Sequence, residues 1–122
     1  MSATAWVLLG HGSRDAQWAA PLERLAQQLR ELAHGPNLVA CAYLEHTPPT
    51  LAKVADQLAQ DGAQHITVLP LFFGMGKHAR GDLPALIAQT RAAHPGITLA
   101  CLDSFGEHPL LAQWVAQAFD TP

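Results

Sequence analysis

Short apolar runs alternate with helix-like patterns four times along the chain, and no other feature constrains the fold as much. The runs lie near residues 5–9, 37–43, 66–71 and 97–102. The first is continuously apolar, which is typical of a parallel strand covered on both faces. Strand–helix units with short connections form right-handed crossovers and a parallel sheet with helices on both sides. We therefore predict one doubly wound α/β domain over residues 1–122, βαβαβαβα, with a four-stranded parallel sheet.

A helix is expected after each strand. Spacings of three and four place these residues on the buried stripe of the first helix: Trp18, Leu22, Leu25, Leu29 and Leu32. Thr47 is expected to cap the second helix. A long loop is expected over residues 72–81, followed by a third helix capped by Asp82 with Pro84 in its first turn. Pro109 is expected to open the last helix, which carries Leu110, Leu111, Trp114, Val115 and Phe119.

Composition and charge exclude several classes of protein. Seven Lys+Arg against ten Asp+Glu give a net charge of -3 with no run of like charges, which argues against a nucleic-acid binder. We find neither a membrane-spanning stretch nor a signal peptide, so a cytoplasmic location is expected. Cys41 and Cys101 lie in apolar strand-like runs, which indicates buried thiols and argues against a disulfide framework or a zinc knuckle.

The loops that follow the strands carry the chemically interesting residues, and ligands of such folds bind beyond the carboxyl ends of the strands. These loops hold His11, Glu45, His46, Lys77, His78, Arg80, Asp103 and His108. His11 comes directly after a buried strand, between two glycines that let the backbone turn tightly and leave the imidazole exposed. A functional role for His11 is therefore predicted.

Three common site motifs are incomplete in this sequence. Asp15 stands where a dinucleotide-binding loop needs its third glycine. Ser13 lacks the flanking glycines of a nucleophile elbow, and Lys77 lacks the neighbours of a phosphate-binding loop. Dinucleotide-binding, hydrolase and nucleotidase interpretations lose their main support.

The histidines divide into a candidate metal site and structural positions. His11 and His78 follow neighbouring strands and Glu45 adds a carboxylate, a set that suits Co²⁺, Fe²⁺ or Ni²⁺. His34 and His94 end helices, where an imidazolium complements the helix dipole, and His65 is expected on the surface. His46 and His108 are open between ligand contact and a capping role.

Several segments together resemble the short-form CbiX/SirB sirohydrochlorin chelatases. They are GHGSRD at residues 10–15, Leu44-Glu45, LPLF at residues 69–72, GKHARGDLP at residues 76–84, and FGEHPLL at residues 105–111. The resemblance implies insertion of Co²⁺ or Fe²⁺ into sirohydrochlorin for cobalamin or sirohaem synthesis, without ATP or an organic cofactor. It implies that His11 and His78 bind the metal and act in catalysis, with Glu45 as the nearby acidic residue. It also implies a homodimer.

Insertion of a metal into a tetrapyrrole requires the removal of two pyrrole protons, and a neutral imidazole can both ligate the ion and accept a proton. A macrocycle fringed with carboxylates also needs cations and an apolar floor. We expect the substrate to contact Ser13, Arg14, Phe72, Phe73, Met75, Lys77 and Arg80.

Two alternative functions stay open. The His11-Gly12 step is similar to the phosphorylated histidine of mannose-type phosphotransferase IIA domains, which predicts a phosphocarrier but leaves His78 and Glu45 without a role. The same ligands could also hold a metal in a noncatalytic binding module. Metal insertion into a tetrapyrrole by the purified protein separates these functions.

Overall fold

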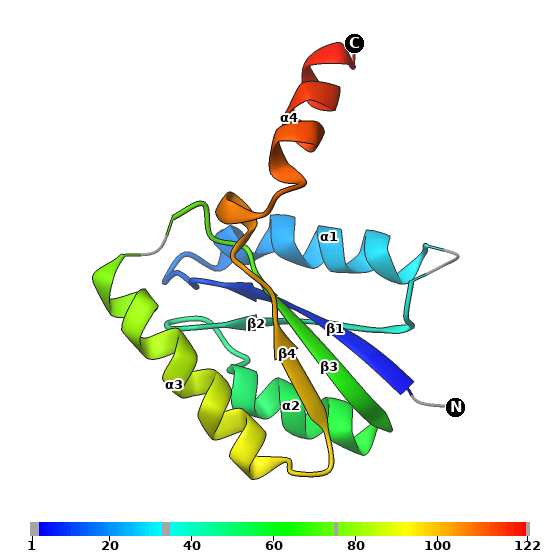
Figure 1. Cartoon of the computed structure of the whole chain (residues 1–122), viewed down its shortest axis with the longest axis vertical. Helices are drawn as coiled ribbons and strands as arrows, with labels where there is room; N and C mark the ends of the chain where they lie inside the picture. Colours follow the sequence, from blue (N-terminus) through cyan, green and yellow to red (C-terminus); the bar gives the residue numbers. More distant parts are fainter. Residues whose placement is uncertain (1–2, 33–34, 75, 122) are drawn as a thin grey trace.

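A four-stranded parallel sheet forms the centre of the molecule (Figure 1). The computed structural model describes residues 3–32, 35–74 and 76–121, without the side chains of residues 77–79. The strands are β1 (Ala3–Gly10), β2 (Leu38–Tyr43), β3 (Ala63–Pro70) and β4 (Thr98–Cys101). They pair in the order β2-β1-β3-β4, which confirms the predicted sheet and places Pro70 at a strand end, where a missing N–H is tolerated.

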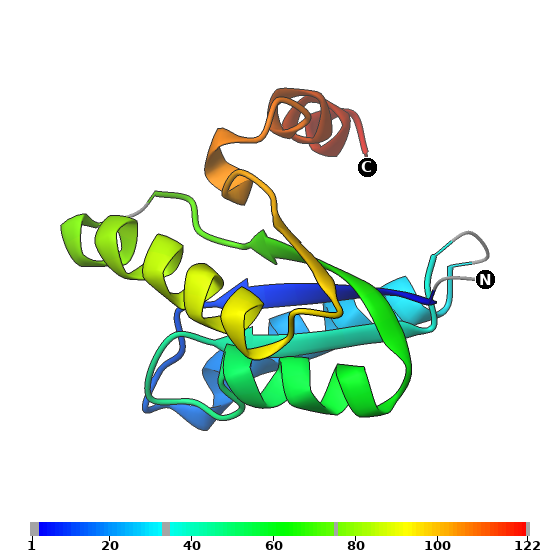
Figure 2. The same ribbon diagram turned by 60° about the horizontal axis from the view of Figure 1, so that its bottom comes forward.

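Helices cover both faces of this sheet. The described helices are α1 (Ala20–Arg30), α2 (Leu51–Gln60), α3 (Lys77–Ala93) and α4 (Leu111–Asp120), with short 3₁₀ helices η1 (Ala16–Ala19) and η2 (Phe105–Glu107). The first helix, α1, lies over β1 and β2 on one face, while α2 and α3 lie on the other face (Figure 2). No helix in the described ranges is both long enough and apolar enough to cross a membrane.

The two layers have separate apolar cores. The core toward α2 and α3 is the larger, and its fully buried side chains include Leu9, Leu51, Ile66, Val68 and Phe72. The core toward α1 contains Leu8, Ala26, Val39, Cys41 and Tyr43. Burial in this second core raises the pKa of the Cys41 thiol to about 12. Cys41 is a buried free thiol as predicted, whereas Cys101 is a free thiol that is only half-buried.

The third helix begins earlier than the sequence predicts. Gly76, in extended backbone, is the N-cap, so Gly81 and Asp82 lie within α3 and the expected loop over residues 72–81 is half helical. Pro84 therefore lies inside the helix and not in its first turn. A proline there removes one backbone hydrogen bond, a loss that the rest of this 17-residue helix tolerates. His78 is consequently a residue of the first helical turn.

Two further expectations for the helices are wrong. Thr50, and not Thr47, caps α2, because its hydroxyl accepts a hydrogen bond from the Lys53 N–H at 3.3 Å. Trp18 lies in η1 with 65% of its surface exposed, and Leu32 lies beyond the end of α1 and is also exposed. The short helix η1 interrupts the 3.6-residue period before α1 begins, so the packed stripe is shorter than predicted.

The last helix, α4, does not cover the sheet. It leaves the body of the protein and projects away from the other layers (Figures 1 and 2). Trp114 is 60% exposed and Phe119 is 86% exposed. The Gly106 N–H donates to the Phe72 carbonyl at 2.9 Å and fixes η2 beyond the carboxyl end of β3, so α4 starts outside the sheet.

Candidate functional site

The loops that follow β1 and β2 remain paired after the strands end. The Leu44 N–H donates to the Gly10 carbonyl, and the Glu45 N–H donates to the His11 carbonyl, each at 3.0 Å. These bonds extend the β1–β2 ladder by two residues beyond Tyr43. They place the backbones of His11 and Glu45 side by side at the carboxyl end of the sheet, as expected.

A threonine hydroxyl and a glycine complete this connection. Thr47 Oγ1 accepts a hydrogen bond from the Ser13 N–H at 2.9 Å and donates one to the Ser13 carbonyl at 2.7 Å. Gly12 has a φ of +90°, and a Cβ there would lie 1.7 Å from the Glu45 carbonyl oxygen. Only glycine fits this conformation and this approach, so the backbone next to His11 is tightly defined.

The imidazole of His11 stacks on an aromatic ring from the neighbouring strand. The Leu71 N–H donates to the Leu9 carbonyl at 2.8 Å, which continues the β1–β3 pairing and brings Phe72 beneath His11. The two ring centroids are 4.3 Å apart and the planes are tilted by 33°. Phe72 is buried and His11 is exposed, so the imidazole has one packed face and one face open to a ligand.

A hollow of about 580 Å³ opens beside His11. It lies between η1, the start of α1 and the ends of β1, β2 and β3, and its size falls within the range of about 300–1,000 Å³ common for ligand sites. Its walls are mainly apolar and aromatic: Gly10, His11, Gly12, Asp15, Gln17, Trp18, Pro21, Leu22, Tyr43, Leu71, Phe72 and Phe73. A flat, largely apolar ligand that carries polar groups at its edge would suit these walls.

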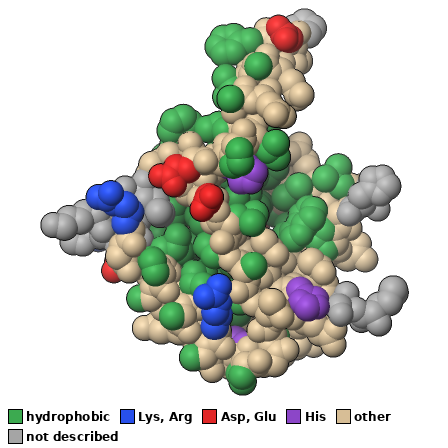
Figure 3. Space-filling model, viewed as in Figure 1, with side chains coloured by type: hydrophobic (Ala, Val, Ile, Leu, Met, Phe, Trp, Pro, Cys, Tyr) green, Lys and Arg blue, Asp and Glu red, His purple; other side chains and the backbone are tan. Residues whose placement is uncertain are grey.

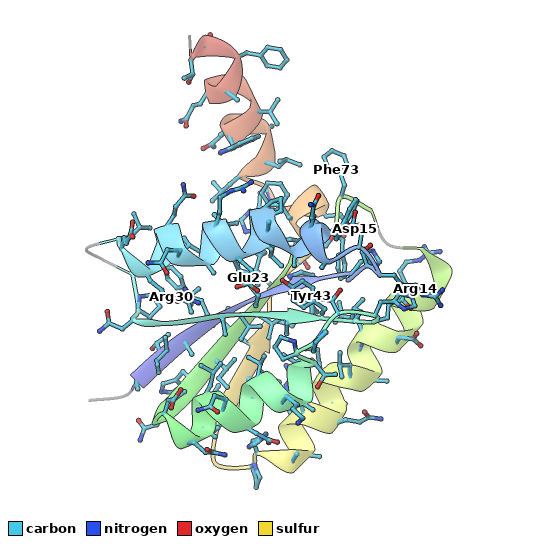
Figure 4. All side chains as sticks on the ribbon, turned by 180° about the vertical axis from the view of Figure 1, so that it is seen from behind. Arg14, Asp15, Glu23, Arg30, Tyr43 and Phe73 are labelled. Carbon is cyan, nitrogen blue, oxygen red and sulfur yellow. The ribbon has the colours of Figure 1, made fainter. Side chains whose placement is uncertain are left out.

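Of the residues predicted for the site, three line the hollow: His11, Phe72 and Phe73. Phe73 points outward from the loop after β3 and is 80% exposed (Figure 4). Ser13, Glu45, Arg14 and Arg80 are not part of the wall. The Ser13 hydroxyl accepts a hydrogen bond from the Asp15 N–H at 3.1 Å, and both arginines are exposed.

The second predicted histidine falls in a segment whose side chains are not described. The backbone of His78 lies in the first turn of α3, whereas the side chains of Lys77 and His78, and all of Met75, lie outside the described residues. Within the described part of the chain, no three His, Cys, Asp or Glu side chains form a metal-binding group. A convergence of His11 with His78 stays a prediction.

Glu45 and His46 form a pair of their own. His46 adopts a φ of 63°, and its Nε2 lies 3.8 Å from a carboxylate oxygen of Glu45. The Glu45 side chain is 64% exposed, so it can turn toward a ligand above the sheet. His108 has a capping contact, because its Nδ1 accepts a hydrogen bond from the Leu110 N–H at 3.2 Å. His94, as expected, has a structural role and lies 2.8 Å from Asp56.

Trp18 and Tyr43 line the hollow, but sequence reasoning assigned neither to the site. The hydroxyl of Tyr43 lies 3.1 Å from a carboxylate oxygen of Glu23 under α1 (Figure 4), and burial raises the pKa of Tyr43. The position of Tyr43 as the last residue of a strand was a usable signal. Trp18 fits the spacing of the apolar stripe of the first helix, so the sequence predicts a core residue there and not a site residue.

Comparison with known proteins identifies the family. The CbiX family model matches residues 5–121. A sirohydrochlorin cobaltochelatase from Methanocaldococcus jannaschii is 32% identical over 90 residues, which are 74% of this chain and 62% of that protein. The chloroplastic sirohydrochlorin ferrochelatase of Arabidopsis thaliana is 29% identical over 86% of this chain and 46% of that protein. The chain thus spans about half to three fifths of the length of these curated relatives.

Solved structures give the same fold. A CbiX protein from Marinobacter aquaeolei superposes with a TM-score of 0.77 at 31% identity, covering 96% of this chain and 94% of that one. The sirohydrochlorin chelatase SirB from Bacillus subtilis, solved with cobalt, has a TM-score of 0.73 at 23% identity and is covered over 50% of its length. At that identity the likeness to SirB supports the fold alone.

Proposed function

Because this chain belongs to the CbiX family, we propose that it is a sirohydrochlorin chelatase that inserts Co²⁺ or Fe²⁺ into the tetrapyrrole without ATP. The observation that carries the proposal is the position of His11. Its backbone is fixed by the paired loops, one face of its ring packs on Phe72, and the other opens beside an aromatic hollow of about 580 Å³. A single imidazole so placed can meet both a metal ion and the edge of a flat ring.

The reaction exchanges two pyrrole protons for one divalent metal ion. In the proposed mechanism, a neutral His11 holds the incoming ion through a ring nitrogen or accepts a pyrrole proton as the nitrogen lone pair turns toward the metal. The exposed carboxylate of Glu45, on the adjacent loop, takes the released proton toward solvent. Phe72, Phe73 and Trp18 supply the apolar surface for the macrocycle.

The remaining predicted residues have supporting roles in this proposal. His78, at the start of α3, is the second metal ligand and base, and Lys77 and Met75 are proposed to contact the substrate. Arg14 and Arg80 are exposed and would pair with the carboxylates at the edge of the substrate. Ser13 contributes by holding the loop through Thr47 and Asp15.

We also propose that the working form is a homodimer. The hollow beside His11 is open to solvent, and a domain of this size offers only part of a wall to a large macrocycle. A second copy would supply the missing wall for a ligand as large as a tetrapyrrole. The cytoplasmic location expected from the sequence is kept in the proposal, although the Arabidopsis relative is named as a chloroplast protein.

An anaerobic absorbance assay tests the proposal directly. Sirohydrochlorin is mixed with Co²⁺, Fe²⁺ or Ni²⁺ with and without the protein, and the uncatalysed rate is subtracted. His11→Ala is expected to slow insertion by on the order of 100-fold or more, the usual size of a lost general base. His65→Ala, which removes an exposed imidazole near the opposite end of β3, is the matched control and should keep the wild-type rate.

The same assay separates the alternatives. Metal binding without insertion would indicate a binding module. Absence of both, with transfer of phosphate to His11 from a phosphorylated carrier protein, would indicate a phosphocarrier. An equal rate in wild type and His11→Ala would contradict the mechanism.

A further inference from the structure

Glu45 and His46 are neighbours on the loop after β2, and their side chains lie close together. His46 Nε2 is 3.8 Å from a carboxylate oxygen of Glu45, which is too long for a hydrogen bond. Zn²⁺, a guide for first-row metal ions, binds imidazole nitrogen at about 2.0–2.1 Å and carboxylate oxygen at about 2.0–2.2 Å, so one ion can join two such atoms up to about 4 Å apart. The observed spacing is therefore one that a single divalent ion can bridge.

The backbone at His46 is held in a rare conformation. The Thr47 N–H donates to the Glu45 carbonyl at 2.7 Å across His46, whose φ is 63°. A three-residue turn with a positive φ at its centre is the rare, strained form of the γ-turn. The residues on either side are anchored, since Glu45 is bonded to the His11 backbone and Thr47 to the Ser13 backbone. Backbone strain that is held in place in this way is typical of ligand sites.

A second histidine–carboxylate pair, His94 with Asp56, shows what is unusual about the first. Its two atoms are 2.8 Å apart, a direct contact that leaves no room for an ion, and the His94 side chain is only 18% exposed. The side chains of His46 and Glu45 are 38% and 64% exposed, so solvent and ions reach both. On the face of the molecule drawn in Figure 3, the histidine side chains lie apart from one another. The Glu45–His46 pair is therefore the better candidate for a site that shares an ion.

The pair also lies beside His11 at the carboxyl end of the sheet. The Glu45 N–H donates to the His11 carbonyl at 3.0 Å, so the two residues are cross-strand neighbours on the paired loops. His11 is exposed and has one ring face packed on Phe72. An ion held by Glu45 and His46 is therefore next to the residue that is proposed to receive it.

We propose that Glu45 and His46 form an outer site that captures the divalent metal ion from solution and passes it to His11. An imidazole nitrogen and a carboxylate oxygen suit Co²⁺, Fe²⁺ and Ni²⁺. Among the residues that the structure describes, no third His, Cys, Asp or Glu joins them, so water completes the coordination. A site with few protein ligands binds weakly and releases its ion readily, which suits capture and transfer better than storage.

Transfer of the ion and release of the protons use the same carboxylate in turn. When the ion leaves Glu45 for His11, the carboxylate can take the pyrrole proton that the proposed mechanism assigns to it. One divalent ion moves inward and two protons move outward, so charge balances. This transfer step rests on the proposed function, whereas capture of the ion does not.

Equilibrium dialysis against Co²⁺, without tetrapyrrole, tests the capture site. The test uses the full chain with His11→Ala, which lacks the inner ligand. Adding His46→Asn removes the imidazole but keeps the turn, because asparagine tolerates a positive φ. The dissociation constant for Co²⁺ is expected to rise at least about tenfold, the smallest usual cost of disturbing a metal site. The matched control, His65→Asn, removes an exposed imidazole from β3 and should change nothing.

His78→Ala in the same background separates the outer site from the second ligand of the proposed mechanism. Co²⁺ binding should persist in this variant, and circular dichroism checks that every variant keeps the wild-type fold. Three results would each overturn the proposal: no Co²⁺ binding by His11→Ala, no weakening of that binding by His46→Asn, or its loss in His78→Ala.

The steady-state kinetics of insertion test the transfer step. With His11 intact, His46→Asn should raise the KM for Co²⁺ by about tenfold and leave kcat unchanged, the pattern of a lost binding contact. His65→Asn should leave both constants at their wild-type values. A fall in kcat at saturating Co²⁺ with an unchanged KM would place His46 in the chemical step and contradict a capture role.

The two experiments distinguish a failure of this inference from a failure of the proposed function. If His46→Asn weakens Co²⁺ binding but the wild-type chain inserts no metal, the proposed function fails and the outer site stands. If the wild-type chain inserts metal but His46→Asn changes neither Co²⁺ binding nor the KM, the outer site alone fails.

Discussion

The loops after β1 and β2 and the segment after β4 both lie at the carboxyl end of the sheet. We call the paired loops after β1 and β2 the closed region, because contacts within the described chain complete them, and the segment after β4 the open region. Between β1 and β2, two backbone hydrogen bonds and the Thr47 hydroxyl fix the residues around His11. After β4, η2 is anchored on Phe72, but α4 leaves its apolar side exposed.

The difference indicates which parts of the site one chain can build alone. A histidine that must hold a metal ion and accept a proton needs a defined position, and the paired loops provide it. A wall for a large flat substrate needs area, which a 122-residue domain with an unpacked helix does not provide. We therefore assign the proposed chemistry to the closed region and the enclosure of the substrate to the open region.

The largest effect is expected from a substitution at Gly12, which would separate the paired loops of the closed region. In Gly12→Ala, the new Cβ would overlap the Glu45 carbonyl at a φ of +90°, so the two loops must separate. We expect a loss of about 3 kcal/mol in the free energy of unfolding, from backbone strain and steric overlap together. Displacement of His11 should slow metal insertion by on the order of 100-fold. Urea denaturation and the absorbance assay measure the two effects.

Gly62→Ala is the matched control for this variant. Gly62 has a φ of +96°, but no atom lies within 4 Å of the position that its Cβ would take. We expect only the strain of about 1–2 kcal/mol and an unchanged insertion rate. Equal effects of the two substitutions would show that the loop contact at Gly12 is unimportant.

A smaller effect is expected from the Thr47 hydroxyl. Thr47→Val keeps the shape but leaves the half-buried Ser13 N–H without its acceptor, at a cost of about 1–2 kcal/mol. The insertion rate should fall about tenfold, in line with a modest loss of positioning. Thr50→Val removes the cap of α2 at a similar cost, but the rate should not change. A fall in the rate for Thr50→Val would mean that both losses reflect stability alone.

Alkaline pH tests the stability of the core toward α1, which contains Cys41 and Tyr43. The folded chain keeps the Cys41 proton up to a pKa of about 12, whereas the ordinary thiol value is 9.0, so the folded state binds more protons between these values. The free energy of unfolding should therefore fall as pH rises above 9, by about 1.4 kcal/mol per pH unit for this group. Burial raises the pKa of Tyr43 in the same sense. In urea denaturation from pH 8 to 10.5, Cys41→Ala should give a shallower slope; an unchanged slope would contradict the shift.

The four strands and their alternation with helices along the chain can be predicted from the sequence, because each apolar run is short and bounded by turn residues. The adjacency of His11 and Glu45 follows as well, since both come directly after neighbouring parallel strands. The start of α3 did not, because Gly81, Asp82 and Pro84 resemble a helix start wherever they lie. Gly76, the actual N-cap, has no side chain that could form a capping hydrogen bond and so gives no signal in the sequence.

The role of α4 illustrates a limit of pattern reasoning. The spacing of Leu111, Val115 and Phe119 predicts an amphipathic helix, and the structure contains it. The periodicity predicts that the apolar side of α4 is covered, but it does not indicate what covers it. Trp18 is the converse case, an aromatic residue that fits a buried stripe but lines an open hollow.

In the proposed homodimer, one chain places His11, but two chains are needed to insert the metal. The most direct measurement is the rate of Co²⁺ insertion by the double variant Trp114→Ser with Phe119→Ser, which removes the two exposed aromatic rings of α4. The rate is measured at a concentration where sedimentation shows that this variant is a monomer and circular dichroism shows the wild-type fold. We expect a rate at least tenfold below that of wild type, while Gln113→Ser with Gln117→Ser keeps the full rate as a dimer. A proven monomer that inserts metal at the wild-type rate would contradict it.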